Sequence, residues 1–201
     1  MSGAGYDPDT LAFYEGQATI YAHRPHDGRF EPLWRFLDGL APGAKILELG
    51  CGGGRDAAEM IRLGFAVTPT DGSPAMAAQA EQRLGMPVRV MRFEELDAEA
   101  AFDAVWASAS LLHARADALP DVLAKVRRAL RPGGRFFASF KLGEGGDRDK
   151  FGRYYNFPTK AGLLAAYETA GPWASLSAHG VSGSGYDGVD RDWLMCLAVR
   201  P

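Results

Sequence analysis

The chain has 201 residues, of which 47% are hydrophobic and 23% are charged, and these proportions are typical of a soluble globular domain. They exclude a disordered or coiled-coil protein, and the length suits a single α/β domain. The net charge of −3 produces no overall positive field that would attract nucleic acid. No apolar run approaches the roughly 18 residues of a membrane-spanning helix. We therefore expect a cytoplasmic domain that binds neither nucleic acid nor a membrane.

The chain contains two cysteines, Cys51 in a glycine-rich stretch and Cys196 in the predicted last strand. This separation in the predicted fold argues against a disulfide between them. Neither belongs to a Cys/His ligand pattern, so we expect no metal site. The N-terminal sequence MSGAGYDPDT lacks the basic start and apolar core of a secretory signal, which agrees with a cytoplasmic location.

The predicted elements begin with two helices, at about 11–21 and 29–40, and aromatic residues occur throughout this segment. We expect it to form an N-terminal helical cap. Residues 44–140 then alternate between apolar strands and helices. The predicted strands are 44–49, 65–70, 88–91, 102–107 and 135–140, and the predicted helices are 55–63, 73–85 and 119–130. This alternation is typical of a parallel sheet covered by helices on both faces.

After residue 140, the sequence no longer predicts alternating strands and helices of a parallel sheet. Residues 142–158 are rich in glycine, charge and tyrosine, and we expect a long lid-like loop there. A helix at about 159–170 and two strands at about 174–181 and 192–199 follow, and the turn between these strands predicts an antiparallel edge. The predicted organisation is one doubly wound α/β domain over 1–201, made of a cap (1–40), a cofactor-binding core (44–140), the loop (142–158) and a C-terminal helix with strands (159–201).

The most informative motif is Glu48-Leu-Gly50-Cys-Gly52-Gly-Gly54-Arg-Asp56, which connects the first predicted strand to a helix. Its glycines let the backbone turn sharply and approach a ligand closely. A dinucleotide pattern, G-x-G-x-x-A, can be placed on residues 52–57. That placement leaves Gly50 unused, and the carboxylates of Glu48 and Asp56 would repel a pyrophosphate. A cationic amino-acid tail would be attracted by them, so a zwitterionic ligand with a sulfonium fits better.

Asp71 ends the second predicted strand, 21 residues after Gly50. A carboxylate at this position can accept hydrogen bonds from both ribose hydroxyls of an adenosine. Nicotinamide sites share the feature, so it indicates an adenosine ligand without selecting one. The alternative is that Asp71 only opens the turn Asp71-Gly72-Ser73-Pro74.

Four segments resemble, in order, the motifs of class I (Rossmann-like) S-adenosylmethionine-dependent methyltransferases. They are ILELGCGGG, TDGSPAMAAQA, FDAVWASASLLH and LRPGGRFFASF, between residues 44 and 140. The resemblance implies S-adenosyl-L-methionine as cofactor and a mostly parallel seven-stranded sheet with an antiparallel last strand. The chain also looks similar to a small bacterial subgroup related to tellurite-resistance methyltransferases.

The same resemblance implies which residues bind the cofactor. They are Tyr21, Glu48, Gly50, Gly52, Gly54, Asp71, Gly72, Met76, Arg92, Phe93, Ala107 and Ser108. The glycine loop would contact the methionine portion, Asp71 the ribose, and Met76 the adenine, while Tyr21 would cover the cofactor. Many relatives carry an aspartate after the third strand that accepts from the adenine amino group. Arg92 in this region cannot accept a hydrogen bond, which leaves the role to Glu94 or to backbone groups.

Residues outside these motifs suggest an acceptor site. His113 follows the fourth strand at the ligand edge of the sheet, where it would act as a general base or as a structural histidine. Tyr14 and Tyr21 share one helix face and would cover the cofactor or pack against the sheet. Cationic and phenolic groups gather after the fifth strand, at Lys141, Arg148, Arg153, Tyr154 and Tyr155. Lys141, Arg153, Tyr154 and Tyr155 are the predicted substrate-binding residues.

This cluster would hold an anionic small molecule, unless nearby acidic residues neutralise it on the surface. The predicted function is direct in-line methyl transfer to a small-molecule acceptor, which gains mainly from positioning and from excluding water. The alternatives are a nicotinamide-dependent oxidoreductase and a non-catalytic S-adenosylmethionine-binding protein.

Overall fold

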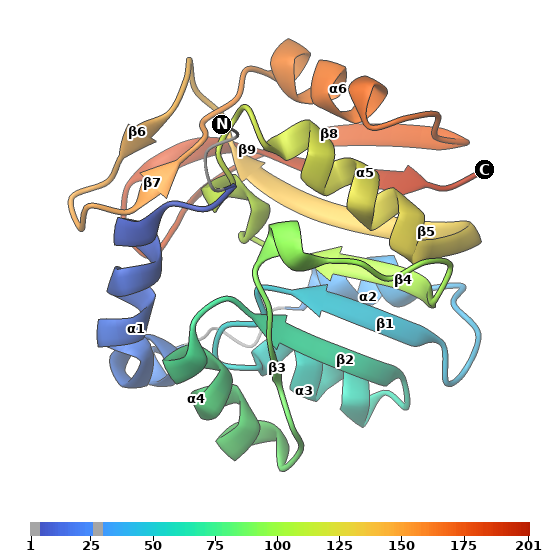
Figure 1. The fold of residues 1–201 in the computed structure, drawn as a ribbon, viewed down its shortest axis with the longest axis horizontal. Helices are drawn as coiled ribbons and strands as arrows, with labels where there is room; N and C mark the ends of the chain where they lie inside the picture. Colours follow the sequence, from blue (N-terminus) through green and yellow to red (C-terminus); the bar gives the residue numbers. More distant parts are fainter. Residues whose placement is uncertain (1–4, 26–29) are drawn as a thin grey trace.

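The computed structural model describes residues 5–25 and 30–201. Within them, a seven-stranded sheet has the order β3-β2-β1-β4-β5-β9-β8 (Figure 1). Its strands are β1 (Lys45–Leu49), β2 (Ala66–Asp71), β3 (Arg89–Val90), β4 (Phe102–Ala107), β5 (Leu130–Lys141), β8 (Ser175–Ser184) and β9 (Asp190–Val199). The strands β1 to β5 pair in parallel, whereas β9 pairs antiparallel with both β5 and β8. The predicted doubly wound sheet with an antiparallel last strand is confirmed.

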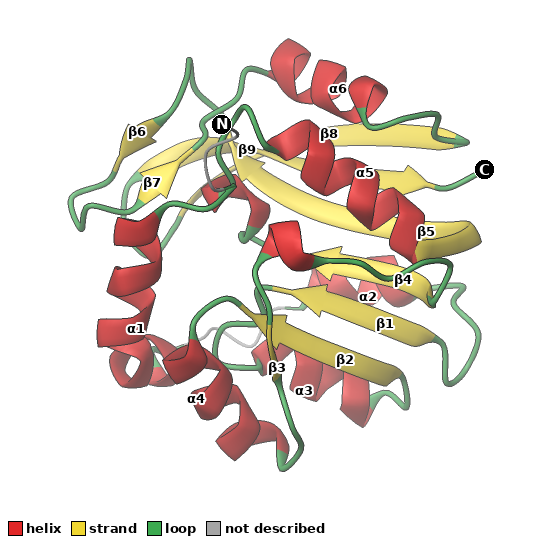
Figure 2. Ribbon diagram, in the orientation of Figure 1, coloured by secondary structure: helices red, strands yellow, loops and turns green. Residues whose placement is uncertain are grey.

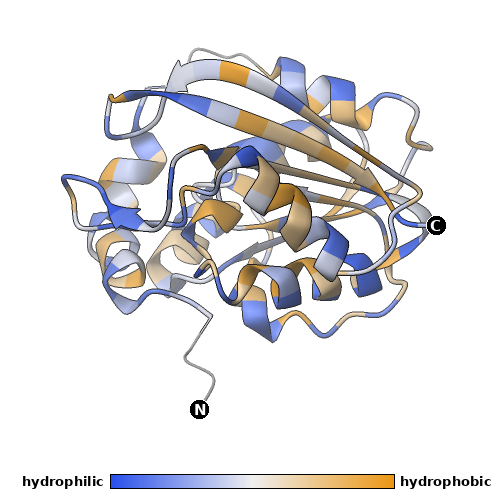
Figure 3. Ribbon diagram, turned by 90° about the horizontal axis from the view of Figure 1, so that it is seen from above, coloured by the Kyte–Doolittle hydropathy of each residue, from blue (hydrophilic) through white to orange (hydrophobic). Residues whose placement is uncertain are grey.

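Helices cover both faces of this sheet (Figure 2). They are α1 (Pro8–His23), α2 (Glu31–Leu37), α3 (Arg55–Arg62), α4 (Pro74–Leu84), α5 (Leu119–Ala129) and α6 (Lys160–Thr169). On the face of α5 and α6, Val122 packs in one core with Phe136. On the face of α2 and α3, Phe36 and Met60 pack with Trp106. The helices in Figure 3 carry both hydrophobic and hydrophilic residues, as expected where one side of a helix faces a core.

The ends of α4 follow from local sequence. The Ser73 hydroxyl accepts a hydrogen bond from the backbone N–H of Met76 (3.1 Å), and Pro74 is the first helical residue. Gly85 ends the helix in the left-handed conformation. The sequence prediction of this helix is confirmed, and the cap places the end of β2 directly before the N-terminus of α4.

The strand order reverses between β1 and β4, and ligands bind beside the carboxyl ends of the strands at such a point. The helix α1 and the hairpin of β6 (Asp147–Arg148) and β7 (Tyr154–Tyr155) lie beyond this edge in Figure 1. The guanidinium of Arg148 donates to both carboxylate oxygens of Asp7 (3.0 and 2.7 Å). The backbone N–H of Tyr154 donates to the Thr10 hydroxyl (2.7 Å). These bonds attach the N-terminal helix to the hairpin.

Several boundaries differ from the sequence predictions. The segment predicted as a lid-like loop contains the β6–β7 hairpin. The strand β5 begins at Leu130, before the predicted 135, because Leu130 already pairs with Phe102 ahead of a register shift. The helix predicted at 29–40 begins outside the described residues, and α2 ends at Leu37. Across 5–25 and 30–201, no helix is long and apolar enough to cross a membrane.

Candidate active site

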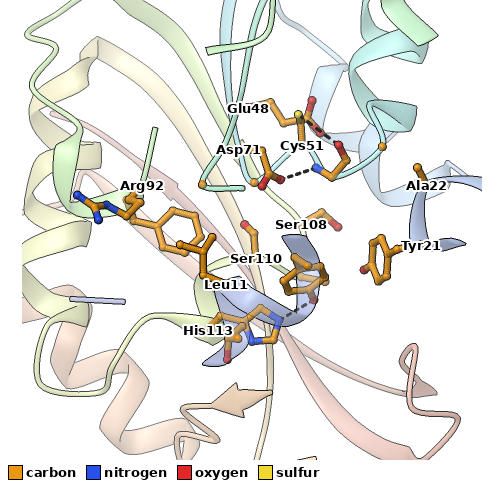
Figure 4. A pocket seen from close by; sticks show the side chains of 18 of the residues that line it. Leu11, Tyr21, Ala22, Glu48, Cys51, Asp71, Arg92, Ser108, Ser110 and His113 are labelled. Atoms are coloured by element: carbon orange, nitrogen blue, oxygen red, sulfur yellow. Dashed lines mark hydrogen bonds between the residues drawn. The ribbon is translucent and has the colours of Figure 1, made fainter. Parts of the chain in front are cut away.

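A pocket of about 290 Å³ opens where α1 faces the carboxyl ends of β1, β2 and β4. Its lining comes from α1, the loops after β1, β3 and β4, and the end of β2. The lining residues are Tyr6, Asp7, Thr10, Leu11, Tyr14, Tyr21, Ala22, Arg24, Glu48, Gly50, Cys51, Gly52, Gly53, Arg55, Asp56, Asp71, Gly72, Arg92, Phe93, Ser108, Ala109, Ser110 and His113. Figure 4 shows Glu48, Cys51 and Asp71 on one side, with Leu11 and His113 across the pocket from them.

The loop after β1 is held close to its neighbours. Gly50 has a φ of +71°, and a Cβ built on it would lie 2.6 Å from the Cβ of Ser110. A side chain is therefore excluded twice at Gly50, by the left-handed backbone and by lack of space. The backbone N–H of Cys51 donates to the Thr70 carbonyl (2.8 Å), and that of Gly52 donates to Asp71 Oδ2 (2.9 Å). The loop is thus hydrogen-bonded to the end of β2 at two successive residues.

Three carboxylates line the pocket beside this loop, those of Glu48, Asp56 and Asp71. Glu48 is buried, and this burial raises its pKa well above the usual range, with a further contribution from the other two carboxylates. In the described part of the chain, Glu48 Oε2 has no hydrogen-bond partner. Asp56 accepts from the indole N–H of Trp106 (2.8 Å). Such acceptors suit a cationic ligand group and oppose a phosphate.

Asp71 is positioned by two backbone donors. Its Oδ2 accepts from Gly52 and its Oδ1 accepts from the backbone N–H of Ser73 (both 2.9 Å). Burial raises the pKa of Asp71 to about 6, against the lowering effect of these two donors, and the nearby Glu15 also raises it. The Asp71 side chain thus accepts a hydrogen bond within the turn and also lines the pocket. Its role in the turn therefore does not prevent it from binding a ribose.

Two arginines line the pocket next to the C-terminal end of α1, Arg24 and Arg55. Arg55 donates to the carbonyl oxygens of Ala22 (3.2 Å) and Arg24, and its Nη1 has no hydrogen-bond partner within the described ranges. The guanidinium of Arg24 lies 3.7 Å from the centroid of the Tyr21 ring. Cations and carboxylates therefore meet around the glycine loop, as a zwitterionic ligand requires.

The predicted adenine region lies at the other side of Gly72. A Cβ on Gly72 would lie 3.5 Å from Arg92 Cγ and 3.7 Å from Leu11 Cδ1, so these two side chains and Phe93 form a largely apolar slot. Arg92 pairs with Glu95 (2.6 Å) and Glu94 (3.3 Å). Glu94 does not belong to the pocket lining, and this position favours backbone groups over Glu94 as partners of an adenine amino group.

One helix face contributes several lining residues, including four that the sequence analysis did not select: Asp7, Thr10, Leu11 and Ala22. Asp7, Thr10, Leu11, Tyr14, Tyr21 and Ala22 recur at intervals of three, four or seven along α1 and its cap. This spacing was visible in the sequence, and it marks one face of a helix. Three of the remaining unselected residues belong to the glycine-rich motif itself, namely Cys51, Gly53 and Arg55. No comparable sequence signal marks the other four, which are Tyr6, Arg24, Ala109 and Ser110.

His113 lines the pocket in a defined tautomer. Its Nδ1 lies 2.6 Å from the carbonyl oxygen of Tyr154, which can only accept, so Nδ1 carries the proton. Its Nε2 lies 3.0 Å from the Tyr14 hydroxyl and therefore accepts from it. Burial lowers the pKa of His113 to about 4, and the guanidinium of Arg153 contributes to the lowering. The imidazole is thus neutral at physiological pH.

The predicted substrate-binding cluster differs from the sequence expectation. Lys141, Arg153, Tyr154 and Tyr155 lie outside the pocket lining. Arg153 is buried, with Nε and Nη2 donating to Asp149 (3.0 and 2.6 Å), and Lys141 is buried against Asp187 (3.1 Å). Each cation already has a carboxylate partner, so the cluster is an internal ion-pair network behind the pocket. Arg153 Nη1 reaches the pocket indirectly, by donating to the Tyr14 hydroxyl (2.9 Å).

The structure places most of the predicted cofactor residues in the lining. They are Tyr21, Glu48, Gly50, Gly52, Asp71, Gly72, Arg92, Phe93 and Ser108. Three others lie behind it: Gly54 at the start of α3 against Ala80, Met76 beneath Gly52, and Ala107 buried at the end of β4. Within the described ranges, no group of three His, Cys, Asp or Glu side chains is placed to hold a metal ion.

Comparisons with known proteins identify the fold and the kind of cofactor that similar proteins bind. The family described as "Methyltransferase domain" matches residues 46–134. A ubiquinone biosynthesis O-methyltransferase from Xanthomonas campestris pv. campestris is 39% identical over 108 residues, which are 49% of this chain and 43% of that protein. A homologue from Paramagnetospirillum magneticum is 37% identical over 142 residues, 67% of this chain and 51% of that protein. The chain thus spans about half the length of the curated relatives it matches.

A solved structure matches the whole chain. It is the 1,6-didemethyltoxoflavin-N1-methyltransferase of Burkholderia thailandensis, with bound 1,6-didemethyltoxoflavin and S-adenosylhomocysteine. It has 25% sequence identity and a TM-score of 0.69, and the match covers 100% of this chain and 93% of that one. The predicted similarity to tellurite-resistance methyltransferases stays a prediction. The chain has the class I S-adenosylmethionine-dependent methyltransferase fold, with the methyltransferase domain in residues 46–134.

Proposed function

We propose that this protein transfers a methyl group from S-adenosyl-L-methionine to a small-molecule acceptor by direct in-line displacement. The observation that carries the proposal is the buried group of acceptors around the glycine loop, above all Glu48 with its unpartnered Oε2. The Burkholderia thailandensis relative binds both S-adenosylhomocysteine and a small molecule. In-line transfer depends chiefly on positioning, which a pocket bounded by α1 and the sheet edge provides.

The residues present fit this cofactor. Glu48 and Asp56 would hold its ammonium group, Arg24 and Arg55 its carboxylate, and Asp71 its ribose hydroxyls. The slot of Leu11, Arg92 and Phe93 would take the adenine. When bound, the cofactor supplies an electrophilic methyl group on a sulfonium. We further propose that α1 and residues 142–158 cover the bound ligand, because Arg148 and Tyr154 attach them to each other.

A nicotinamide-dependent oxidoreductase is the less favoured alternative. A pyrophosphate brings no cation to offset the burial of the Glu48 and Asp56 carboxyl groups, whereas the ammonium of S-adenosyl-L-methionine would pair with them. A non-catalytic S-adenosylmethionine-binding protein would not need an ordered hydrogen-bonding pair such as Tyr14 and His113 in its pocket.

Calorimetry with two ligands tests the proposed function. We expect S-adenosylhomocysteine to bind the purified protein and NAD not to bind. The physical reason is the acidic lining, which attracts the ammonium of the first ligand and repels the pyrophosphate of the second. Micromolar binding of NAD, or absence of S-adenosylhomocysteine binding, would contradict the proposal.

The affinity for S-adenosylhomocysteine should rise with pH across the Asp71 pKa of about 6. Ribose hydroxyls donate to the ionised carboxylate of Asp71. Below this pH the carboxyl is protonated and must lose its proton when the ligand binds, so the affinity falls about tenfold for each pH unit. Calorimetry in two buffers of different ionisation enthalpy counts the protons released. About one pH unit below the Asp71 pKa of about 6, where the free carboxyl is almost fully protonated, Asp71→Asn should release nearly one proton fewer than the wild type. An unchanged proton count would show that Asp71 is not the titrating group.

A further inference from the structure

The Tyr14 hydroxyl is the pocket group whose hydrogen bonding is most fully determined. It donates its one proton to His113 Nε2 (3.0 Å) and accepts from Arg153 Nη1 (2.9 Å). These directions follow from the two partners. His113 Nδ1 donates to the Tyr154 carbonyl, so Nε2 of the neutral ring can only accept, and the Arg153 guanidinium can only donate. The remaining capacity of the Tyr14 oxygen is to accept one further hydrogen bond. Burial raises the pKa of Tyr14 well above its usual range, so the hydroxyl stays protonated.

Because the Tyr14 oxygen can only accept a further hydrogen bond, it favours a ligand group that carries a proton. A neutral O–H or N–H can donate to the Tyr14 oxygen, whereas an anion would meet a lone pair and be repelled. The cations nearby do not reverse this preference, because Arg92 pairs with Glu95, Arg148 with Asp7, and Arg153 with Asp149. The other two arginines of the lining, Arg24 and Arg55, would hold the cofactor carboxylate under the proposed function. The pocket therefore favours an acceptor whose nucleophile carries a proton.

The same part of the pocket presents aromatic rings. The ring centroid of Tyr14 lies 5.1 Å from that of Tyr21 and 5.5 Å from that of His113, both in edge contact. All three rings line the pocket. Rings in edge contact form an apolar corner that can contact both the face and the edge of an aromatic ligand, with the polar contact confined to one hydroxyl.

We propose that Tyr14 is a catalytic residue that takes the proton from the acceptor, and that the acceptor is an aromatic compound with a neutral hydroxyl. This inference rests on the proposed function. His113 receives the proton through Tyr14, and Arg153 and Asp149 act as positioning residues. This replaces the anionic acceptor expected from the sequence.

The proton moves between stated atoms. The acceptor oxygen gives its proton to Tyr14 Oη while Tyr14 gives its own proton to His113 Nε2, so Tyr14 remains neutral. A lone pair of the acceptor oxygen forms the bond to the methyl carbon, and the pair of the broken carbon–sulfur bond stays on sulfur. The positive charge of the sulfonium thus ends on the imidazolium of His113. With a pKa of about 4, this imidazolium returns its proton to water, which restores the starting state.

Methyl transfer to two phenols tests the proposal. The first probe is 4-methylphenol, which is the side chain of tyrosine and is un-ionised at neutral pH; the second is pentafluorophenol, which is ionised there. We expect the wild type to methylate 4-methylphenol. Tyr14→Phe should lower kcat/KM for 4-methylphenol by roughly 100-fold or more. It should not lower kcat/KM for pentafluorophenol, because this probe has no proton to give and the lone pair that repels it is removed. S-adenosylhomocysteine affinity should be the same in both proteins.

The matched control is Tyr186→Phe, which removes a hydroxyl from a tyrosine that packs on Tyr21 but does not line the pocket. It should change neither activity. Equal losses on both phenols in Tyr14→Phe, no loss on either, or a wild type that methylates only pentafluorophenol or neither probe would overturn the proposal. If the wild type fails to bind S-adenosylhomocysteine, the proposed function itself has failed.

A readout without turnover is the ¹⁵N NMR spectrum of the histidine rings with S-adenosylhomocysteine bound. We expect the His113 ring to carry its proton on Nδ1 and to have an unprotonated Nε2 whose resonance shifts in Tyr14→Phe but not in Tyr186→Phe. A proton on Nε2 of wild-type His113 would contradict the inference, because Tyr14 could then not donate to it.

Discussion

Gly50→Ala should destabilise the protein by about 2–5 kcal/mol and weaken S-adenosylhomocysteine binding. The left-handed backbone at φ +71° costs an L-residue about 1–2 kcal/mol. The new methyl group would lie 2.6 Å from the Cβ of Ser110, and overpacking of this kind costs roughly 1–3 kcal/mol. To relieve the clash, the loop must move away from Ser110 and thus out of the ligand position. Each 1.4 kcal/mol of lost ligand contact weakens binding about tenfold.

Gly43→Ala is the matched control, because Gly43 has nearly the same φ (+74°) and an added Cβ would meet no heavy atom of the described residues within 4 Å. It should cost only the backbone strain of about 1–2 kcal/mol and leave ligand affinity unchanged. Chemical denaturation and calorimetry measure the two quantities. If the two variants behaved alike, the tight contact between Gly50 and Ser110 would have no energetic importance.

Asp149→Ala should lower the free energy of unfolding by about 3–5 kcal/mol, which is the usual cost of leaving a buried charge without its partner. The side chains of Arg153 and Asp149 are 1% and 2% exposed, so water cannot replace the lost carboxylate. For a chain of this size, the corresponding fall in melting temperature is about 6–20 °C. The Tyr14 hydroxyl would also lose the fixed position of its Arg153 donor.

Asp147→Ala provides the comparison, because Asp147 is exposed two residues away and its side chain accepts, among residues 5–25 and 30–201, only from the backbone N–H of Arg148. Its effect should stay within about 0.5 kcal/mol. Thermal denaturation of both variants is the measurement. A small effect of Asp149→Ala would mean that Arg153 reaches solvent, and the argument for its positioning role would fail.

The parts of the site that the sequence predicted are those determined locally. Gly50 adopts the left-handed backbone of a turn, Ser73 caps a helix, and Asp71 ends a strand. Each of these features is determined by only a few neighbouring residues. The parallel sheet was predictable for a similar reason, since apolar strands that alternate with helices leave few arrangements.

The contacts that depend on how distant segments pack were not predictable. Tyr14 and His113 are 99 residues apart in sequence, and their hydrogen bond depends on the docking of α1 against the β6–β7 hairpin. Lys141 meets Asp187, 46 residues away, across a hairpin whose turn the sequence did not delimit. The charge pattern of residues 141–155 therefore suggested an anion site, although folding pairs these cations internally.

The position of β9 has a consequence for how the chain is made. This strand follows every other strand of the sheet in sequence, yet it lies between β5 and β8, and Leu194, Cys196 and Ala198 on it are almost fully buried. Until residues 190–199 leave the ribosome, β5 exposes an unpaired apolar edge, which is a template for pairing with other chains. The pocket half of the protein can form early, whereas the sheet closes only after β9 has been synthesised. Newly made chains are therefore most prone to aggregate through the β5 edge, on the half of the sheet away from β2 and β3.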